Sequence, residues 1–339
     1  MKKTLGNVLR FLIFAGIGVF FIWLFLHKLT GEQKTEILQS FREANYLWLG
    51  IAIILGVLSH YERSVRWRML IEPMGYRPRA GNTFFAVMIG YIANLALPRL
   101  GEVSRCTVLT RYENVPFNKG FGTVITERAI DMIIFLLLFF VNIAIQYNRL
   151  SAYINTKIFE PLQEKLSLSF SLGNSLLIIA IVGIALLAGL YFILRKRLSK
   201  NKLYQKIKHL VDGFVQGLKS LLLIKNPWLF VFHSLGIWAL YLLMAYLVFF
   251  CMPESSHLGI DAGLAALVFG SIGIMIVQGG IGIYPAIIAE TLVLYGVEST
   301  KGYALGWLIW SSQTITIILL GVISLIILPI INKKKDVEA

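Results

Sequence analysis

Ionisable residues within or beside two strongly apolar stretches constrain the fold of this chain more than any other feature of its sequence. They fall between Asn94 and Asp131. The set comprises Arg99, Glu102, Arg105, Glu127, Arg128 and Asp131. An ionisable group in the hydrocarbon region of a membrane costs roughly 2.5–3.5 kcal/mol on insertion scales. Such groups usually pair, face a water-filled cavity and serve a function.

The composition indicates a membrane protein. Hydrophobic residues make up 57% of the chain and charged residues 15%, whereas soluble globular proteins carry about 25% charged residues. We therefore predict an all-α polytopic membrane protein whose residues 1–339 form a single integral membrane domain. Six segments are long enough to cross a hydrocarbon core of about 30 Å as helices. They are 8–26, 46–62, 121–147, 174–194, 227–250 and 303–330.

Two further apolar stretches are interrupted. Residues 82–98 contain Asn94 and Pro98, and residues 260–278 run into the sequence Gln278-Gly-Gly-Ile-Gly282. Non-helical backbone at membrane depth is tolerated only where it is buried in protein or lines a wet cavity. We therefore predict two re-entrant helical hairpins that enter from opposite faces.

The two interruptions occur at corresponding positions of the approximate halves 1–150 and 174–330. Paired breaks of this kind indicate an inverted repeat with a binding site between its two copies. Alternatively, the glycines at 279, 280 and 282 only permit close helix packing.

The distribution of positive charge predicts the orientation. With the hairpins as above, most of the 32 Lys and Arg residues fall in cytoplasmic connections, as the positive-inside rule requires. We expect a multi-pass protein of the cytoplasmic membrane with both termini in the cytoplasm and residues 148–173 outside. Segment 8–26 is expected to be a retained anchor, and the segment near 200–225 an amphipathic helix at the inner surface. Topology thus explains the net charge of +14 without a nucleic-acid partner.

Nothing in the sequence predicts an enzyme. We find no nucleophile with a paired base, no nucleotide-binding glycine loop and no HExxH sequence. The two cysteines, Cys106 and Cys251, lie far apart and lack metal-ligand spacing. We therefore expect no cofactor and no metal site.

Three motifs in the first half carry a resemblance to a known family. They are Arg63-Ser-Val-Arg66-Trp67, Asn94-Leu-Ala-Leu-Pro98-Arg-Leu-Gly101-Glu102 with Arg105, and Thr126-Glu127-Arg128-Ala-Ile-Asp131. In this order they resemble the flippase-like membrane domain of lysylphosphatidylglycerol synthases, which also occurs as a stand-alone protein. The resemblance implies movement of aminoacylated phospholipids or other lipids between leaflets. The printed residues contain no aminoacyltransferase domain, so we expect no lysyl transfer.

The second half departs from the family pattern. Gln278 stands where the family has a proline, and Tyr284-Pro285 follows the turn. Trp310-Ser311-Ser312 occupies the region in which the family has an arginine. These departures concern the identity of the substrate more than the fold.

The candidate substrate-binding residues favour recognition of phosphate. Guanidinium forks match phosphate oxygens, so Arg99 and Arg105 could hold a phosphate. Glu102 lies three residues before Arg105 and could pair with it. In the alternative interpretation, these charges form a self-satisfied ion network. The full candidate set is Asn94, Arg99, Glu102, Arg105, Glu127, Arg128, Asp131 and Gln278.

Glu127 and Asp131 lie four residues apart, so they share a helix face. Buried carboxylates need cationic partners, and Arg99, Arg105 and Arg128 are nearest in the chain. A purely structural salt-bridge cluster is the alternative. We expect Arg63 and Arg66 to extend to the inner headgroups, and Trp67 to lie in an interfacial belt.

The sequence thus predicts transport or flipping of a phosphate-bearing lipid, with membrane lipids as the partners. Aminoacyl-phospholipids, other phospholipids and isoprenoid-linked glycans all remain open as substrates. We expect five residues to converge on one polar cavity that is open toward the cytoplasmic leaflet. They are Arg99, Glu102, Arg105, Glu127 and Asp131. The alternative function is a non-transporting scaffold or partner of a lipid-modifying or glycan-assembling enzyme.

Overall fold

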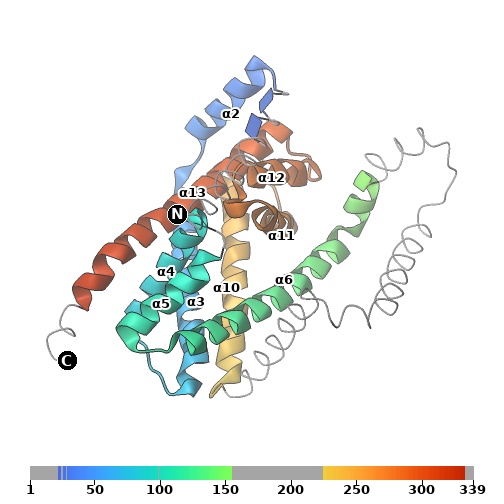
Figure 1. Cartoon of the computed structure of the whole chain (residues 1–339). Helices are drawn as coiled ribbons and strands as arrows, with labels where there is room; N and C mark the ends of the chain where they lie inside the picture. Colours follow the sequence, from blue (N-terminus) through green and yellow to red (C-terminus); the bar gives the residue numbers. More distant parts are fainter. Residues whose placement is uncertain (1–21, 24–25, 28, 98, 155–223, 333–339) are drawn as a thin grey trace, which may run out of the picture. The chain divides into compact units, whose positions relative to one another are not determined.

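The computed structural model describes residues 22–23, 26–27, 29–97, 99–154 and 224–332. In these ranges the secondary structure is α-helix with short 3₁₀ turns and no strand, so the all-α prediction is confirmed there (Figure 1). The α-helices are α2 (Gly31–Glu43), α3 (Tyr46–Ile71), α4 (Ala80–Ala96), α5 (Leu100–Glu113), α6 (Phe117–Ile154), α10 (Pro227–Leu247), α11 (Ile260–Ile276), α12 (Ile283–Val293) and α13 (Ser299–Ile331). The 3₁₀ turns are η1 (Glu72–Met74), η3 (Val248–Cys251) and η4 (Gln278–Gly280).

The chain divides into two compact units, one formed by Met1–Gln146 with Ser220–Ala339 and the other by Tyr147–Lys219. In the second unit only the end of α6, through Ile154, lies within the described residues. All contacts reported below belong to the first unit. The predicted span 174–194, almost all of the amphipathic segment near 200–225 and most of span 8–26 lie outside the described residues and remain predictions.

Several helices have the length and apolar character needed to cross a membrane. Within the described ranges, three qualify alone: Phe117–Tyr147 in α6, Pro227–Cys251 in α10 with η3, and α13. Helices α2 and α3, bent by 73°, pass the same test only as a pair, which can be a broken span or a re-entrant loop. Three of the six predicted spans therefore coincide with helices of the expected kind, or four if the bent pair is one span. The complete count of six remains a prediction.

The first interruption produces a tight helical hairpin. Helix α4 ends at Ala96, Leu97 is extended, and Arg99 adopts a left-handed conformation with φ 64° before α5 begins. The Asn94 Oδ1 atom accepts a hydrogen bond of 2.7 Å from the Gly101 N–H. A Cβ atom on Gly101 would lie 2.1 Å from the carbonyl oxygen of Gly90. Only a glycine at position 101 therefore lets α4 and α5 approach this closely.

The second interruption repeats this backbone turn. Helices α4 and α11 both have 17 residues. The extended residue that caps each one donates its N–H to the carbonyl four residues earlier, Leu97 to Ala93 and Val277 to Gly273. The next left-handed residue is Gly279, with φ 69°. The prediction of corresponding breaks is confirmed in backbone geometry.

The two hairpin turns meet in the first unit. A Cβ atom on Gly279 would lie 3.6 Å from the Cδ2 atom of Leu95, which is ordinary van der Waals contact. The order of elements is also the same on both sides. A long helix precedes each hairpin (α3 and α10), and another follows it (α6 and α13) (Figure 1). This arrangement supports the predicted internal repeat.

Candidate functional site

Five charged side chains from three helices form one ion network, which we call the arginine–carboxylate cluster. Helix α3 contributes Arg63 and Arg66, α5 contributes Arg105, and α6 contributes Glu127 and Asp131. The N–O distances are 2.7 Å for Arg63–Glu127, Arg63–Asp131 and Arg66–Asp131, 2.8 Å for Arg105–Glu127, and 3.5 Å for Arg66–Glu127. Each carboxylate therefore contacts at least two guanidinium groups.

The cluster is buried in protein. Glu127 and Arg66 are 0% exposed, and the other three members are below 9%. Removing ions from water is costly, and mutual attraction offsets that cost only when geometry and hydrogen bonding are good. Three guanidinium groups face two carboxylates, so the five residues together carry one excess positive charge.

The arginines also retain donors that nothing in the described residues accepts. The Nε atoms of Arg63, Arg66 and Arg105 have no hydrogen-bond partner there. Helix α10 supplies only long contacts, from Arg63 Nη2 to the Tyr241 hydroxyl at 3.3 Å and from Arg66 Nη1 to Ser234 at 3.5 Å. A buried donor left unpaired costs about 1–3 kcal/mol. The cluster therefore has both the charge and the spare N–H groups to bind an anion.

Trp67 holds the third arginine in place. The guanidinium carbon of Arg105 lies 4.4 Å from the centroid of the Trp67 ring, within cation–π range. The indole Nε1–H donates to the Thr123 hydroxyl at 2.9 Å, which ties the ring to α6. Trp67 is fully buried. Its predicted place in an interfacial belt is therefore wrong.

The expected positions of Arg63 and Arg66 are also wrong. The apolar pattern suggested a span ending at residue 62, which would put both arginines at the inner headgroups. Helix α3 instead continues to Ile71. It therefore carries both arginines into the packed interior, against the carboxylates of α6. Their spacing of three residues placed them on one face, but the sequence did not indicate which face would be buried.

The pairing expected at the first hairpin differs from that observed. Glu102 binds Arg128 at 3.0 Å rather than Arg105, and Arg105 binds Glu127. The Arg128 side chain is 47% exposed, so this second pair lies at the edge of the packed region. The prediction from spacing was wrong because a buried carboxylate on α6 was available to Arg105.

The remaining candidates have separate positions. Arg99 is exposed, and the ion pairs found among the described residues do not include it. Asn94 supports the hairpin turn through Gly101. Gln278 begins η4, and its side chain lies outside what the structure describes. Of the five residues expected around one open cavity, Arg105, Glu127 and Asp131 converge in one ion network. Arg105 contacts Glu127 directly, and Arg63 bridges Glu127 to Asp131.

Two histidines, one on α3 and one on α10, lie near the arginine–carboxylate cluster. His60, one turn before Arg63, is buried and packs against Tyr91 with ring centroids 4.8 Å apart. His233 of α10 contacts the Glu62 carboxylate of α3. Within the described ranges, no group of three or more His, Cys, Asp or Glu side chains is arranged to hold a metal ion.

Helices that can cross a membrane and a buried ion network define the class: a multi-pass helical membrane protein with a buried charged site. Comparison with known proteins agrees. The chain belongs to the family described as the lysylphosphatidylglycerol synthase TM region, which it matches over residues 7–321. The resemblance inferred from the motifs is therefore confirmed. No solved structure matches the chain.

Relatives include two proteins of Methanocaldococcus jannaschii. UPF0104 membrane protein MJ1595 is 32% identical over 115 residues, 33% of this chain and 34% of that protein. UPF0104 membrane protein MJ1078 is 25% identical over 235 residues, 69% of this chain and 92% of that protein. Glycosyltransferase AglD of Haloferax volcanii is 28% identical over 102 residues, 30% of this chain and 16% of that protein. The matches to MJ1595 and AglD thus span about a third or less of those two proteins.

Proposed function

We propose that this protein moves a phosphate-bearing lipid between membrane leaflets and that the arginine–carboxylate cluster binds its headgroup. The observation that carries this proposal is the excess positive charge of the buried cluster, together with its unpaired guanidinium donors. Intramembrane charges of this kind commonly mark substrate pathways. Arginine is the side chain best suited to forked contacts with phosphate.

The cluster also suggests how substrate and opening are coupled. Separating one member of a buried ion pair costs about 3–5 kcal/mol because the other charge is left uncompensated. A phosphate group that approaches Arg105 can replace the Glu127 oxygen and satisfy the same guanidinium. The arriving headgroup therefore lowers the cost of opening the network. Ion pairs keep the network closed when no anion is present.

Leaflet exchange in liposomes tests the proposal. The purified protein is reconstituted and offered labelled phospholipids, aminoacyl-phospholipids and isoprenoid-linked sugars. Exchange of at least one phosphate-bearing class is expected. Arg105→Lys should slow it, because lysine keeps the charge but loses the planar fork and the contact with Trp67. Arg111→Lys on the same helix is the matched control, because Arg111 is exposed.

Normal lipid exchange by the Arg105→Lys variant would contradict the proposal that the arginine–carboxylate cluster binds the headgroup. Lack of exchange for every lipid class would favour a second function, that of a membrane partner for a lipid-modifying or glycan-assembling enzyme. The similarity to part of a protein named a glycosyltransferase supports this alternative. We propose no catalytic activity for this chain itself, and we place it in the cytoplasmic membrane with both termini in the cytoplasm.

A further inference from the structure

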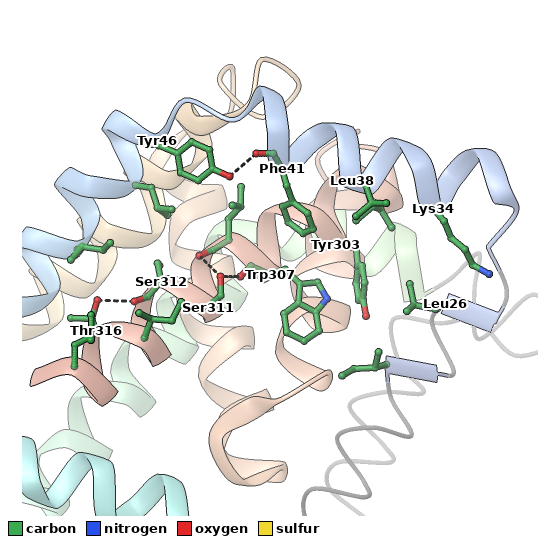
Figure 2. A pocket seen from close by; sticks show the side chains of 17 residues that line it. Leu26, Lys34, Leu38, Phe41, Tyr46, Tyr303, Trp307, Ser311, Ser312 and Thr316 are labelled. Carbon is green, nitrogen blue, oxygen red and sulfur yellow. Dashed lines mark hydrogen bonds between the residues drawn. The ribbon is translucent and has the colours of Figure 1, made fainter. Parts of the chain in front are cut away.

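Two cavities follow one another along α3, away from the arginine–carboxylate cluster. The larger, of about 890 Å³, lies between α2, α3 and α13 (Figure 2). The smaller, of about 530 Å³, lies between α3 and the start of α4. Ile53 lines both cavities. We call the two together the α3 furrow.

The furrow follows one face of α3. Its α3 lining includes Leu49, Ile53, Val57 and Tyr61, which recur every four residues. Arg63 follows Tyr61 by two residues, and residues two apart on a helix do not face the same side. The furrow is therefore a site separate from the headgroup site proposed above.

The lining of the furrow is largely apolar, and its serine and threonine hydroxyls are already hydrogen-bonded to the backbone. Trp307 and Tyr303 of α13 lie beneath α2 in the larger cavity (Figure 2). The serine and threonine hydroxyls in this cavity donate to carbonyls of α13 itself, for example Ser311 to Trp307 at 2.6 Å and Thr316 to Ser312 at 2.7 Å. The Tyr46 hydroxyl donates to the Phe41 carbonyl of α2 at 2.6 Å. Among the described residues that line the two cavities, Lys34 is the only one with a charged side chain. Such a surface fits a hydrocarbon chain.

The length of the furrow selects the kind of chain. At about 1.5 Å per residue, Tyr46 and Tyr61 lie about 23 Å apart along α3. One leaflet contributes only about 15 Å, half of a hydrocarbon core of about 30 Å. The acyl chain of an ordinary phospholipid occupies its own leaflet. A furrow of this length fits a chain that passes the membrane midplane.

Cations lie at both ends of the furrow. Lys34 lines the larger cavity on α2, and α2 is fixed to α13 by the Glu36 carboxylate, which lies 3.3 Å from the Lys301 ammonium. At the other end, the exposed Arg77 and Arg79 closely precede Ala80, which lines the smaller cavity, although neither arginine lines it. The Arg79 Nε atom lies 4.0 Å from the Glu113 carboxylate, so Arg77 is the cation considered at this end.

We propose that the α3 furrow binds a polyisoprenyl phosphate, with the isoprenoid chain along α3 and the phosphate at one of the two cationic ends. This site goes beyond the proposed headgroup cluster, because it would bind this lipid even if the protein transported another. The aliphatic lining, the length and the terminal cations together favour this ligand among the anionic lipids.

Photo-crosslinking of the full-length protein in phosphatidylcholine nanodiscs tests the inference. The probe is a long polyisoprenyl phosphate with a diazirine on its chain, and the labelled peptides are mapped by mass spectrometry. Label is expected on α3 and α13. Unlabelled long polyisoprenyl phosphate should compete, whereas farnesyl phosphate and phosphatidic acid should compete far less. Equal competition by phosphatidic acid would show that ordinary lipids fill the furrow and would overturn the proposal.

Substitutions in α3 localise the chain. Ile53→Trp fills the point shared by the two cavities. It should weaken labelling roughly tenfold, which corresponds to lost contact with about two methylene groups. Leu47→Trp is the matched control, because Leu47 is 67% exposed on the same helix and lines neither cavity. Val57→Trp gives a second block if Ile53→Trp does not fold. Equal labelling of blocked and control variants would overturn the site.

The phosphate end has its own test. Lys34→Gln should weaken binding of polyisoprenyl phosphate about two- to fivefold, as expected for one exposed charge pair, and should leave uncharged polyisoprenol unaffected. Arg42→Gln, also exposed on α2, is the control. If Lys34→Gln weakened binding of the phosphate and of the alcohol equally, Lys34 would not be the residue that binds the phosphate. The Arg105→Lys variant should still be labelled, so failure of the transport proposal and failure of this one are distinguishable.

Discussion

The two halves of the chain build the same hairpin turn with opposite chemistry. In the first half, the Asn94 amide holds the turn through the Gly101 N–H, and arginines and carboxylates pack beside it. In the second, the Trp310 indole N–H donates to the Gly279 carbonyl at 2.6 Å. Gly270 lies against the ring of Tyr284. The backbone turn therefore does not require charge.

The comparison extends to the helices that follow the hairpins. The start of each contains Lys-Gly followed by an aromatic residue, at Lys119 in α6 and Lys301 in α13. Counted from these lysines, Glu127 corresponds to Ile309 and Asp131 to Gln313. The second half packs without the two carboxylates. Since the fold can be built with uncharged residues at these positions, the costly charges of the first half favour a functional role.

The largest expected effect concerns the orientation of the two halves in the membrane, for which the result is all or none. In an inverted repeat, the connections that precede the two hairpins face opposite sides of the membrane. Arg77→Cys and His257→Cys, both at exposed positions, should therefore react with an impermeant thiol reagent from opposite faces. The background is a chain in which the buried Cys106 and Cys251 are replaced. Labelling of both positions from the same face would rule out the inverted repeat.

The next largest effect is expected at Glu127. Glu127→Ala leaves three buried arginines with one carboxylate, so the free energy of unfolding should fall by about 3–5 kcal/mol. The counterpart change, Ile309→Val, should cost only about 0.5–1.5 kcal/mol. Thermal unfolding in detergent measures both. Similar losses for the two variants would mean that the cluster contributes no more than apolar packing.

A smaller effect is expected at the crossing of α4 and α5. Gly101→Ala places a methyl group against the Gly90 carbonyl and should destabilise the hairpin by about 1–3 kcal/mol through overpacking. Gly122→Ala is the control, because a Cβ atom there would meet nothing within 4 Å. The control should be neutral or slightly stabilising, since alanine favours helix over glycine. If Gly101→Ala were as neutral as Gly122→Ala, the hairpin would be less tightly packed than the contacts indicate.

The smallest effects are expected at the two hydrogen bonds that hold the turns. Asn94→Ala and Trp310→Phe each remove one donor or acceptor from a backbone partner. Each should cost about 0.5–1.5 kcal/mol, the net value of such a bond. Unfolding measurements on both variants compare the halves directly. A much larger loss at Asn94 would show that the turn of the first half depends on its polar support more than its counterpart does.

The sequence predicted the interruptions well and the pairing poorly. Pro98 and Gly101 indicated the first break, and the glycines of 279–282 indicated the second. Such residues are informative because local backbone conformation depends on the residues nearby. The partner of Arg105 was predicted from its spacing to Glu102, yet Glu127 binds it. The missed pairs between α3 and α6 join Arg63 to residues 64 and 68 positions away. Periodicity within one helix does not indicate which other helix will face it.

The sequence by itself determined that the chain is helical and membrane-spanning. Long apolar runs in a hydrocarbon environment must satisfy their backbone hydrogen bonds internally, which favours helices. It also determined which residues carry charge into that environment. Only the tertiary structure decided that α3 continues to Ile71, that Trp67 lies beneath Arg105, and that three arginines share two carboxylates. These contacts depend on how separate helices pack, because burial and ion pairing arise between elements rather than within them.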